Sequence, residues 1–126
     1  MALSMSGSML EQGKGQVRIL IVDDDAAIAD ILKDIVARAG HEVSVCYDGL
    51  SAVDRVESGA YDLLILDLML PGVEGLEVFK VAKAANPDVL VIIITGYATL
   101  ETAIAAIKEG AYDFIQKPFK LDGFQI

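Results

Sequence analysis

The chain has 126 residues, 54% of them hydrophobic, which suits one ordinary domain with a substantial core. A net charge of −9 at pH 7 argues against direct binding of nucleic acid, and no apolar run approaches the roughly 18 residues that a membrane helix needs. The single cysteine, Cys46, excludes an internal disulfide. We therefore expect a cytoplasmic protein, in which Cys46 is a small core residue.

Residues 1–16 are rich in Met, Ser and Gly and show no hydrophobic periodicity. They lack the basic start and the apolar stretch of a secretion signal. We interpret this segment as a flexible tail, of the kind that expression vectors contribute, and residues 17–126 as a single domain without internal repeats.

Five apolar strands alternate with four helices in the rest of the sequence. The predicted strands cover 17–22, 42–46, 62–66, 89–94 and 112–116. An apolar stripe predicts the first helix, which Gly40 closes: Ile28, Ile31, Leu32, Ile35 and Val36. The other helices cover about 49–59, about 74–85, and the segment marked by Leu100, Ile104 and Ile107 and closed by Gly110. This alternation predicts an open parallel sheet with helices on both faces.

The third predicted strand runs directly into Asp67, and Pro71-Gly72 then stops the segment. Its unbroken apolar run is typical of a strand that is buried on both faces. A carboxylate beside so much apolar surface costs several kcal/mol unless it is compensated. Asp67 is therefore either a strand-end residue that bonds the following turn, or a reactive or metal-holding carboxylate.

Other polar residues also follow strands: Asp23 and Asp24 after the first, Thr95 after the fourth and Lys117 after the fifth. The carboxyl ends of parallel strands form one edge of the sheet, where ligands bind in this class of fold. Helix capping, a turn bond and a solvated charge could each explain one of these residues. Those explanations do not predict that all of them lie on the same edge, so we expect them to converge with Asp67 on one pocket.

Three carboxylates within about 5 Å would repel by roughly 3 kcal/mol per pair at an effective dielectric near 20. Lys117 alone offers too little positive charge to offset this. A hard divalent cation fits the deficit, and oxygen-only ligands point to Mg²⁺, with Mn²⁺ as the alternative. A metal, a lysine and a threonine around one carboxylate suit phosphoryl transfer, and an aspartyl phosphate on Asp67 is the simplest product.

These motifs resemble the receiver domain of two-component response regulators, and the match covers about residues 17–119. The matching segments are the run 19–25, Asp67 with Pro71-Gly72, Thr95-Gly96 and Lys117-Pro118-Phe119. The segments 95–98 and 110–115 look most like receivers of nitrogen-regulatory-type transcriptional activators. The resemblance implies a flavodoxin-like α/β fold, with five parallel strands in the order 2-1-3-4-5.

The resemblance also implies roles for individual residues. Asp67 would accept the phosphoryl group from a phosphohistidine of a sensor histidine kinase. Asp24 and Asp67 would bind Mg²⁺ together with the backbone carbonyl of Met69, and Asp23 would hold a metal-bound water.

Lys117 would contact the phosphoryl oxygens, ahead of a cis bond to Pro118. Thr95 would bond a phosphoryl oxygen, and Phe114 would swing inward behind it. The fourth helix, fifth strand and fifth helix would then form a switched face that controls an output domain or partner.

The sequence departs from the family in two places. Met69 puts an apolar side chain beside the acceptor, which leaves the rate of autodephosphorylation open. Residues 120–126 are too few for the family's fifth helix to form a stable helix unaided, so we expect that helix to be truncated. We hypothesise that the chain forms a homodimer or a swapped oligomer that covers the bare face near Phe119, Phe124 and Ile126.

Two other classes remain as alternatives. An aspartate-nucleophile phosphatase of the haloacid dehalogenase type needs Asp-x-Asp after the first strand, whereas Asp23 and Asp24 are contiguous here and Asp67 is isolated. A flavodoxin-like binder needs a phosphate loop rich in hydroxyls and glycine after the first strand, where the acidic run would repel a phosphate.

Overall fold

The structure is a computed structural model that describes residues 17–96 and 100–117. Its elements, in chain order, are β1 (Arg18–Val22), α2 (Ala26–Arg38), β2 (Glu42–Cys46), α3 (Gly49–Val56), β3 (Leu63–Asp67), α4 (Gly75–Ala85), β4 (Leu90–Thr95), α5 (Leu100–Lys108) and β5 (Asp113–Gln116). The predicted bounds agree closely, except that α3 ends before the predicted 59 because the chain turns there at Gly59, with φ 68°. The predicted tail, Pro118, Phe119 and the truncated last helix lie outside the described residues.

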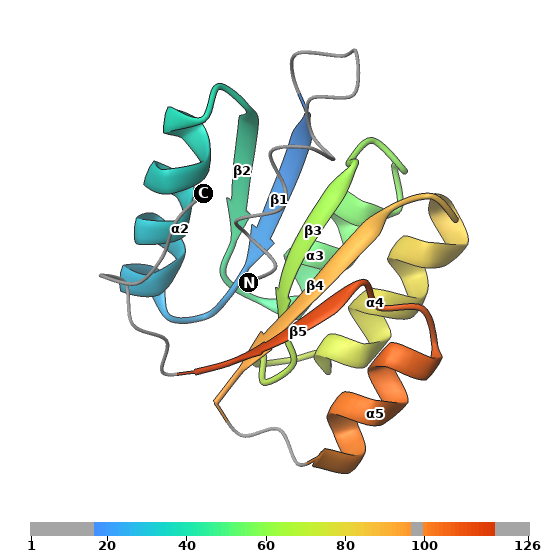
Figure 1. The fold of residues 1–126 in the computed structure, drawn as a ribbon. Helices are drawn as coiled ribbons and strands as arrows, with labels where there is room; N and C mark the ends of the chain where they lie inside the picture. Colours follow the sequence, from blue (N-terminus) through green and yellow to red (C-terminus); the bar gives the residue numbers. More distant parts are fainter. Residues whose placement is uncertain (1–16, 97–99, 118–126) are drawn as a thin grey trace.

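The strands form one five-stranded sheet in the order β2-β1-β3-β4-β5, and every neighbouring pair is parallel. Figure 1 shows α2 on one face of the sheet and α3, α4 and α5 on the other. The predicted flavodoxin-like α/β fold with this strand order is therefore confirmed. The order reverses between β1 and β3, which makes their carboxyl ends the place for a ligand.

The sheet separates two hydrophobic clusters, and β3 contributes to both of them. Leu64 and Leu66 pack on the side of α3, α4 and α5, while Leu63 and Ile65 pack on the side of α2. All five residues of β3 are buried, as the unbroken apolar run predicted. Cys46 is also buried and free, in agreement with its predicted role as a small core residue.

In two helices, some of the large apolar residues of the predicted stripe do not pack against the sheet. In α2 the buried line is Ala29, Leu32 and Val36, and Ile31 is 39% exposed because it lies about 100° around the helix from Leu32. In α5 the small Ala106 is buried, whereas Ile104 is 45% exposed. The stripe of α2 therefore predicted Leu32 and Val36 correctly but not Ile31, and the stripe of α5 did not predict that Ile104 is exposed.

Candidate metal centre and phosphoacceptor site

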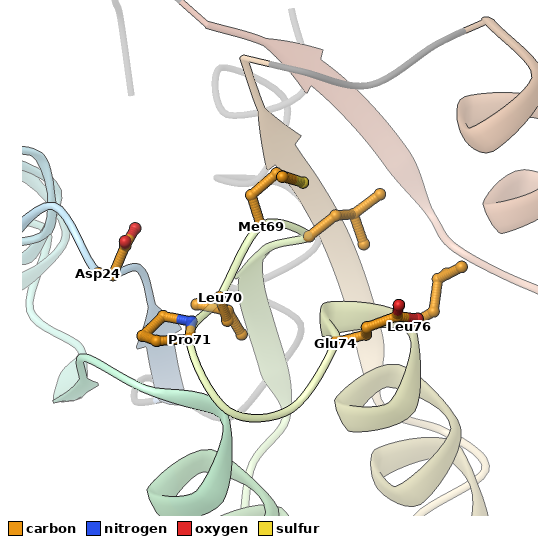
Figure 2. A pocket seen from close by; sticks show the side chains of 7 residues that line it. Asp24, Met69, Leu70, Pro71, Glu74 and Leu76 are labelled. Carbon is orange, nitrogen blue, oxygen red and sulfur yellow. The ribbon is translucent and has the colours of Figure 1, made fainter.

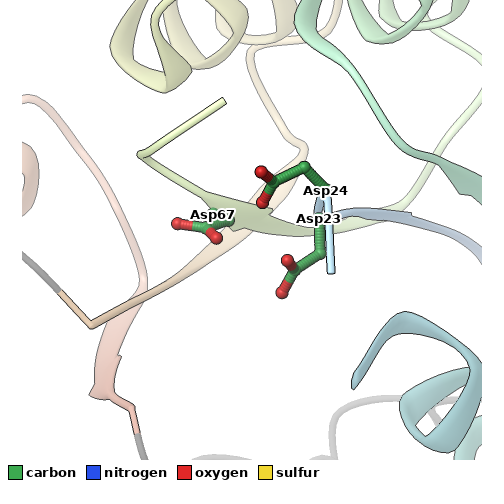
Figure 3. Close-up of side chains that lie close together, drawn as sticks. All are labelled: Asp23, Asp24 and Asp67. Atoms are coloured by element: carbon green, nitrogen blue, oxygen red, sulfur yellow. The ribbon is translucent and has the colours of Figure 1, made fainter. Parts of the chain in front are cut away.

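The carboxyl ends of β1, β3 and β5 bring the predicted acidic residues and the lysine together. Asp23 and Asp24 follow β1, Asp67 ends β3, and Lys117 follows β5. Figure 3 shows the three aspartate side chains gathered at this edge. Thr95 ends β4 at the same edge, paired with Gln116 in the backbone ladder, and its side chain lies outside the described part of the chain.

The three carboxylates lie close enough to share one cation. One carboxylate oxygen from each of Asp23, Asp24 and Asp67 lies within 4.8 Å of the other two. Asp23 is 0% exposed and Asp67 is 3% exposed, whereas Asp24 faces solvent. The cluster is therefore accessible to solvent on the side of Asp24, from which a hydrated ion can enter.

Lys117 joins the two buried carboxylates. Its Nζ lies 2.8 Å from Asp23 Oδ2 and donates a hydrogen bond of 2.9 Å to Asp67 Oδ2. Burial lowers the pKa of the Lys117 ammonium, but its bonds to Asp23 and Asp67 outweigh this effect and raise the pKa overall. Lys117 is thus a charged partner, and one positive charge faces three carboxylates.

The environment of Asp23 fits a bound cation. Burial raises the pKa of the Asp23 carboxyl, and the nearby Lys117 ammonium and the Asp25 N–H offset this only in part. Asp23 Oδ2 accepts no well-directed hydrogen bond and is held only by the charge of Lys117. A buried carboxylate oxygen for which the described residues supply only this ion pair, beside two more carboxylates, fits a divalent metal bound directly or through its water.

Local turns fix the directions of the acidic side chains. Asp25 caps α2 by accepting hydrogen bonds from the N–H groups of Ala27 and Ile28. Asp23 Oδ1 accepts a hydrogen bond of 2.9 Å from the Asp25 N–H, which fixes the Asp23 side chain beside the start of α2. Capping therefore explains Asp25 but not Asp24, whose carboxylate has no hydrogen bond or ion pair within the described ranges.

Asp67 bonds the turn that follows its strand and also lies in the acidic cluster. Its Oδ1 accepts a hydrogen bond of 3.0 Å from the Met69 N–H, which is a bond to the turn that follows the strand. Its Oδ2 faces Lys117 inside the acidic cluster. The turn bond orients the carboxylate within the cluster, and the reactive role of Asp67 stays a prediction.

Two adjoining hollows open at this edge of the sheet. One, of about 620 Å³, is lined by Asp67, Lys117, Asp24, Asp25, Ile28, Met69 and Gly96. The other, of about 670 Å³, has the mainly apolar lining shown in Figure 2. Asp24 and Met69 belong to both, and Met69 is 55% exposed on the rim. No sequence pattern predicted the second hollow, because most of its lining comes from the loop between β3 and α4 and not from a periodic element.

Phe114 lies on β5, half-buried against the cluster that includes the α5 residue Ala106. It is therefore on the strand next to β4, which carries Thr95.

The sequence model of the response regulator receiver domain matches residues 19–125. The chain belongs to this family. Receiver domains are signalling domains of two-component systems, which agrees with the predicted class. Within the described residues, none of the helices is both long and apolar enough to span a membrane.

Known relatives support the assignment. The nitrogen assimilation regulatory protein NtrX of Azorhizobium caulinodans is 40% identical over 106 residues, which are 82% of this chain and 23% of the relative. A CheY-like receiver structure from Methanospirillum hungatei is 36% identical, with a TM-score of 0.78 over 83% of this chain and 84% of that chain.

A third similar protein is a Burkholderia pseudomallei response regulator, solved with a phosphorylated aspartic acid, a calcium ion and citrate. It is 26% identical, with a TM-score of 0.76 over 84% of this chain and 62% of that chain. The chain spans between about a quarter and a half of the length of the first curated relatives that it matches. The similarity to NtrX confirms the predicted likeness to nitrogen-regulatory receivers.

We expect millimolar Mg²⁺ to raise the melting temperature, because the ion relieves repulsion among the three carboxylates and binds only the folded chain. Thermal unfolding with MgCl₂, against NaCl at equal ionic strength as the control, measures this effect. An unchanged melting temperature would mean that the three acids do not share a cation.

Proposed function

We propose that this receiver accepts a phosphoryl group on Asp67 from the phosphohistidine of a sensor histidine kinase, in a Mg²⁺-dependent reaction. The observation that carries the proposal is the convergence of Asp23, Asp24, Asp67 and Lys117 at the carboxyl edge of the sheet. The phosphorylated aspartic acid in the Burkholderia relative supports it.

In this proposal a carboxylate oxygen of Asp67 attacks phosphorus as the bond from phosphorus to the histidine nitrogen breaks. The histidine keeps the electron pair and takes up a proton. Asp67 is suited to this attack because it lines the open hollow and the Met69 N–H orients one of its oxygens. Lys117, now paired with Asp67, is placed to transfer its contact to the phosphoryl oxygens.

Asp24, Asp67 and the Met69 carbonyl would bind the Mg²⁺ ion directly, and Asp23 would hold one of its waters. When bound, the ion neutralises charge on the carboxylates and on the transferred group. Mn²⁺ has the same ligand preference and can replace it. The chain catalyses only its own phosphorylation and dephosphorylation.

Phosphorylation would switch the face formed by α5, β5 and the segment that follows them. Thr95 would bond a phosphoryl oxygen, and Phe114 would move inward behind it. Phe114 is half-buried against the cluster that includes Ala106 and Ala111, so part of its ring is still exposed and could move inward. We assign the reaction to the cytoplasm and the output to another domain or a partner, in keeping with the regulatory name of NtrX.

Beryllofluoride, a phosphoryl mimic, tests the proposal against the two alternative classes. With Mg²⁺ we expect one bound beryllofluoride per chain by ¹⁹F NMR, and no turnover of unrelated phosphomonoesters. Steady hydrolysis of phosphomonoesters would favour a phosphatase, and no uptake of beryllofluoride would contradict the phosphoacceptor assignment.

The hypothesis of a homodimer or swapped oligomer stays a prediction, because residues 118–126 lie outside the described residues. Sedimentation velocity over a wide concentration range tests it. A strict monomer at the highest concentration would contradict it.

A further inference from the structure

The loop between β3 and α4, residues 68–74, is held by two glycines that each open a helix. Gly75 is the first residue of α4, Gly49 is the first residue of α3, and both are buried. The Gly75 N–H donates to the Leu68 carbonyl at 3.1 Å, and the Gly49 N–H donates to the Pro71 carbonyl at 3.3 Å. Neither glycine has a positive φ, so neither position needs glycine for its backbone conformation.

The space beside Gly75 is filled by the backbone of the segment that carries the acceptor. A Cβ placed there would lie 2.5 Å from Leu68 Cα and 2.6 Å from the Asp67 carbonyl oxygen. Both are backbone atoms, so a change of side-chain rotamer cannot relieve the clash. A side chain at this position therefore has to displace either α4 or the backbone at Asp67 and Leu68.

Gly49 lies against the same loop at Val73. A Cβ on Gly49 would lie 2.6 Å from the Val73 carbonyl oxygen and 2.7 Å from Val73 Cβ. Two helices thus approach the loop at distances that only glycine permits. The loop is clamped between them.

We propose that Gly75 is a positioning residue for the metal side of the site, supported from outside by Gly49. This inference rests on the proposed function, in which the Met69 carbonyl is a metal ligand. The Met69 N–H is already bonded to Asp67 Oδ1, so the loop backbone wraps around the acceptor carboxylate. A shift of Leu68 is therefore passed directly to Met69.

Mg²⁺ and Ca²⁺ would respond differently to a shift of the Met69 carbonyl. Mg²⁺ requires near-ideal octahedral geometry at short distances, whereas Ca²⁺ accepts a varied number of oxygens at longer distances. A displaced loop weakens the binding of Mg²⁺ more than that of Ca²⁺. A loss of stability alone would leave the ratio of the Mg²⁺ affinity to the Ca²⁺ affinity unchanged.

The test compares the whole wild-type chain with Gly75→Ala and with a control, Ala82→Gly. Ala82 is 3% exposed and lies further along α4, away from the loop, so its replacement lowers stability without touching the site. Isothermal titration calorimetry gives both metal affinities, and the NMR shift of the Met69 amide reports on the loop. We expect Gly75→Ala to weaken Mg²⁺ binding by about 10- to 100-fold and Ca²⁺ binding by less. We expect Ala82→Gly to lower the melting temperature and to keep both affinities.

Wild-type Mg²⁺ affinity in Gly75→Ala, or an equal loss for both ions, would overturn the inference. If Gly75→Ala does not fold, the same two titrations are made on Gly49→Ala. A lower ratio of Mg²⁺ to Ca²⁺ affinity than in the wild type supports the inference, and an unchanged ratio overturns it. Failure of the wild-type chain to bind Mg²⁺ would contradict the proposed function instead, so the two failures are distinguishable.

Discussion

Asp67→Asn is expected to abolish phosphorylation while leaving the metal-free fold at least as stable as the wild type. The amide oxygen can still accept the hydrogen bond from the Met69 N–H, so the turn is kept. The change removes one of three mutually repelling carboxylates, although it also weakens the pairing with Lys117. Phosphoryl incorporation and urea unfolding measure the two effects.

Asp54→Asn is the matched control, because Asp54 lies exposed on α3 away from the cluster. It should be phosphorylated like the wild type. Strong destabilisation by Asp67→Asn would show that Asp67 has a structural role, and phosphorylation of the variant would show that Asp67 is not the acceptor.

Lys117→Met is expected to lower the free energy of unfolding of the metal-free chain by about 3 kcal/mol at pH 7. Removing one partner of a buried ion pair leaves the other charges uncompensated, and Lys117 is the partner of both Asp23 and Asp67. The same variant should show a larger Mg²⁺-induced rise in melting temperature, because no ammonium competes with the ion. Lys117→Arg, which keeps the charge, should recover much of the stability.

The stability deficit of Lys117→Met should depend on pH. Burial already raises the pKa of the Asp23 carboxyl above its ordinary value of 3.8, and loss of the lysine raises this pKa further. Between the unfolded and folded pKa values, Asp23 is protonated in the folded chain and ionised in the unfolded chain. The loss in free energy of unfolding is therefore complete above the folded pKa of Asp23 and shrinks as the pH falls through it. Urea unfolding from pH 7 down to pH 4 measures this; a variant as stable as the wild type at pH 7 would contradict the account.

The fold and the acidic cluster were predictable from sequence because both follow from the order of elements along the chain. A parallel sheet brings the carboxyl ends of its strands to one edge, so Asp23, Asp24, Asp67 and Lys117 had to be neighbours once the strands were assigned. Strand burial was equally clear, because β3 contains no polar residue before Asp67.

Other features depend on distances that sequence patterns do not encode. The contact of Gly75 with the backbone at Asp67 has no periodic signal, because a glycine at the start of a helix usually suggests only a turn. The exposure of Ile31 and Ile104 depends on where each helix axis lies over the sheet. The bridging of two carboxylates by Lys117 depends on side-chain reach, which the order of elements leaves open.

Phosphorylation mapping by mass spectrometry, with acetyl phosphate as donor and with or without Mg²⁺, tests the central claim most directly. We expect a single acid-labile phosphoryl group, located on Asp67 and formed only when the metal is present. A phosphoryl group on another residue, or equal modification of Asp67 after chelation of the metal, would contradict the proposed site.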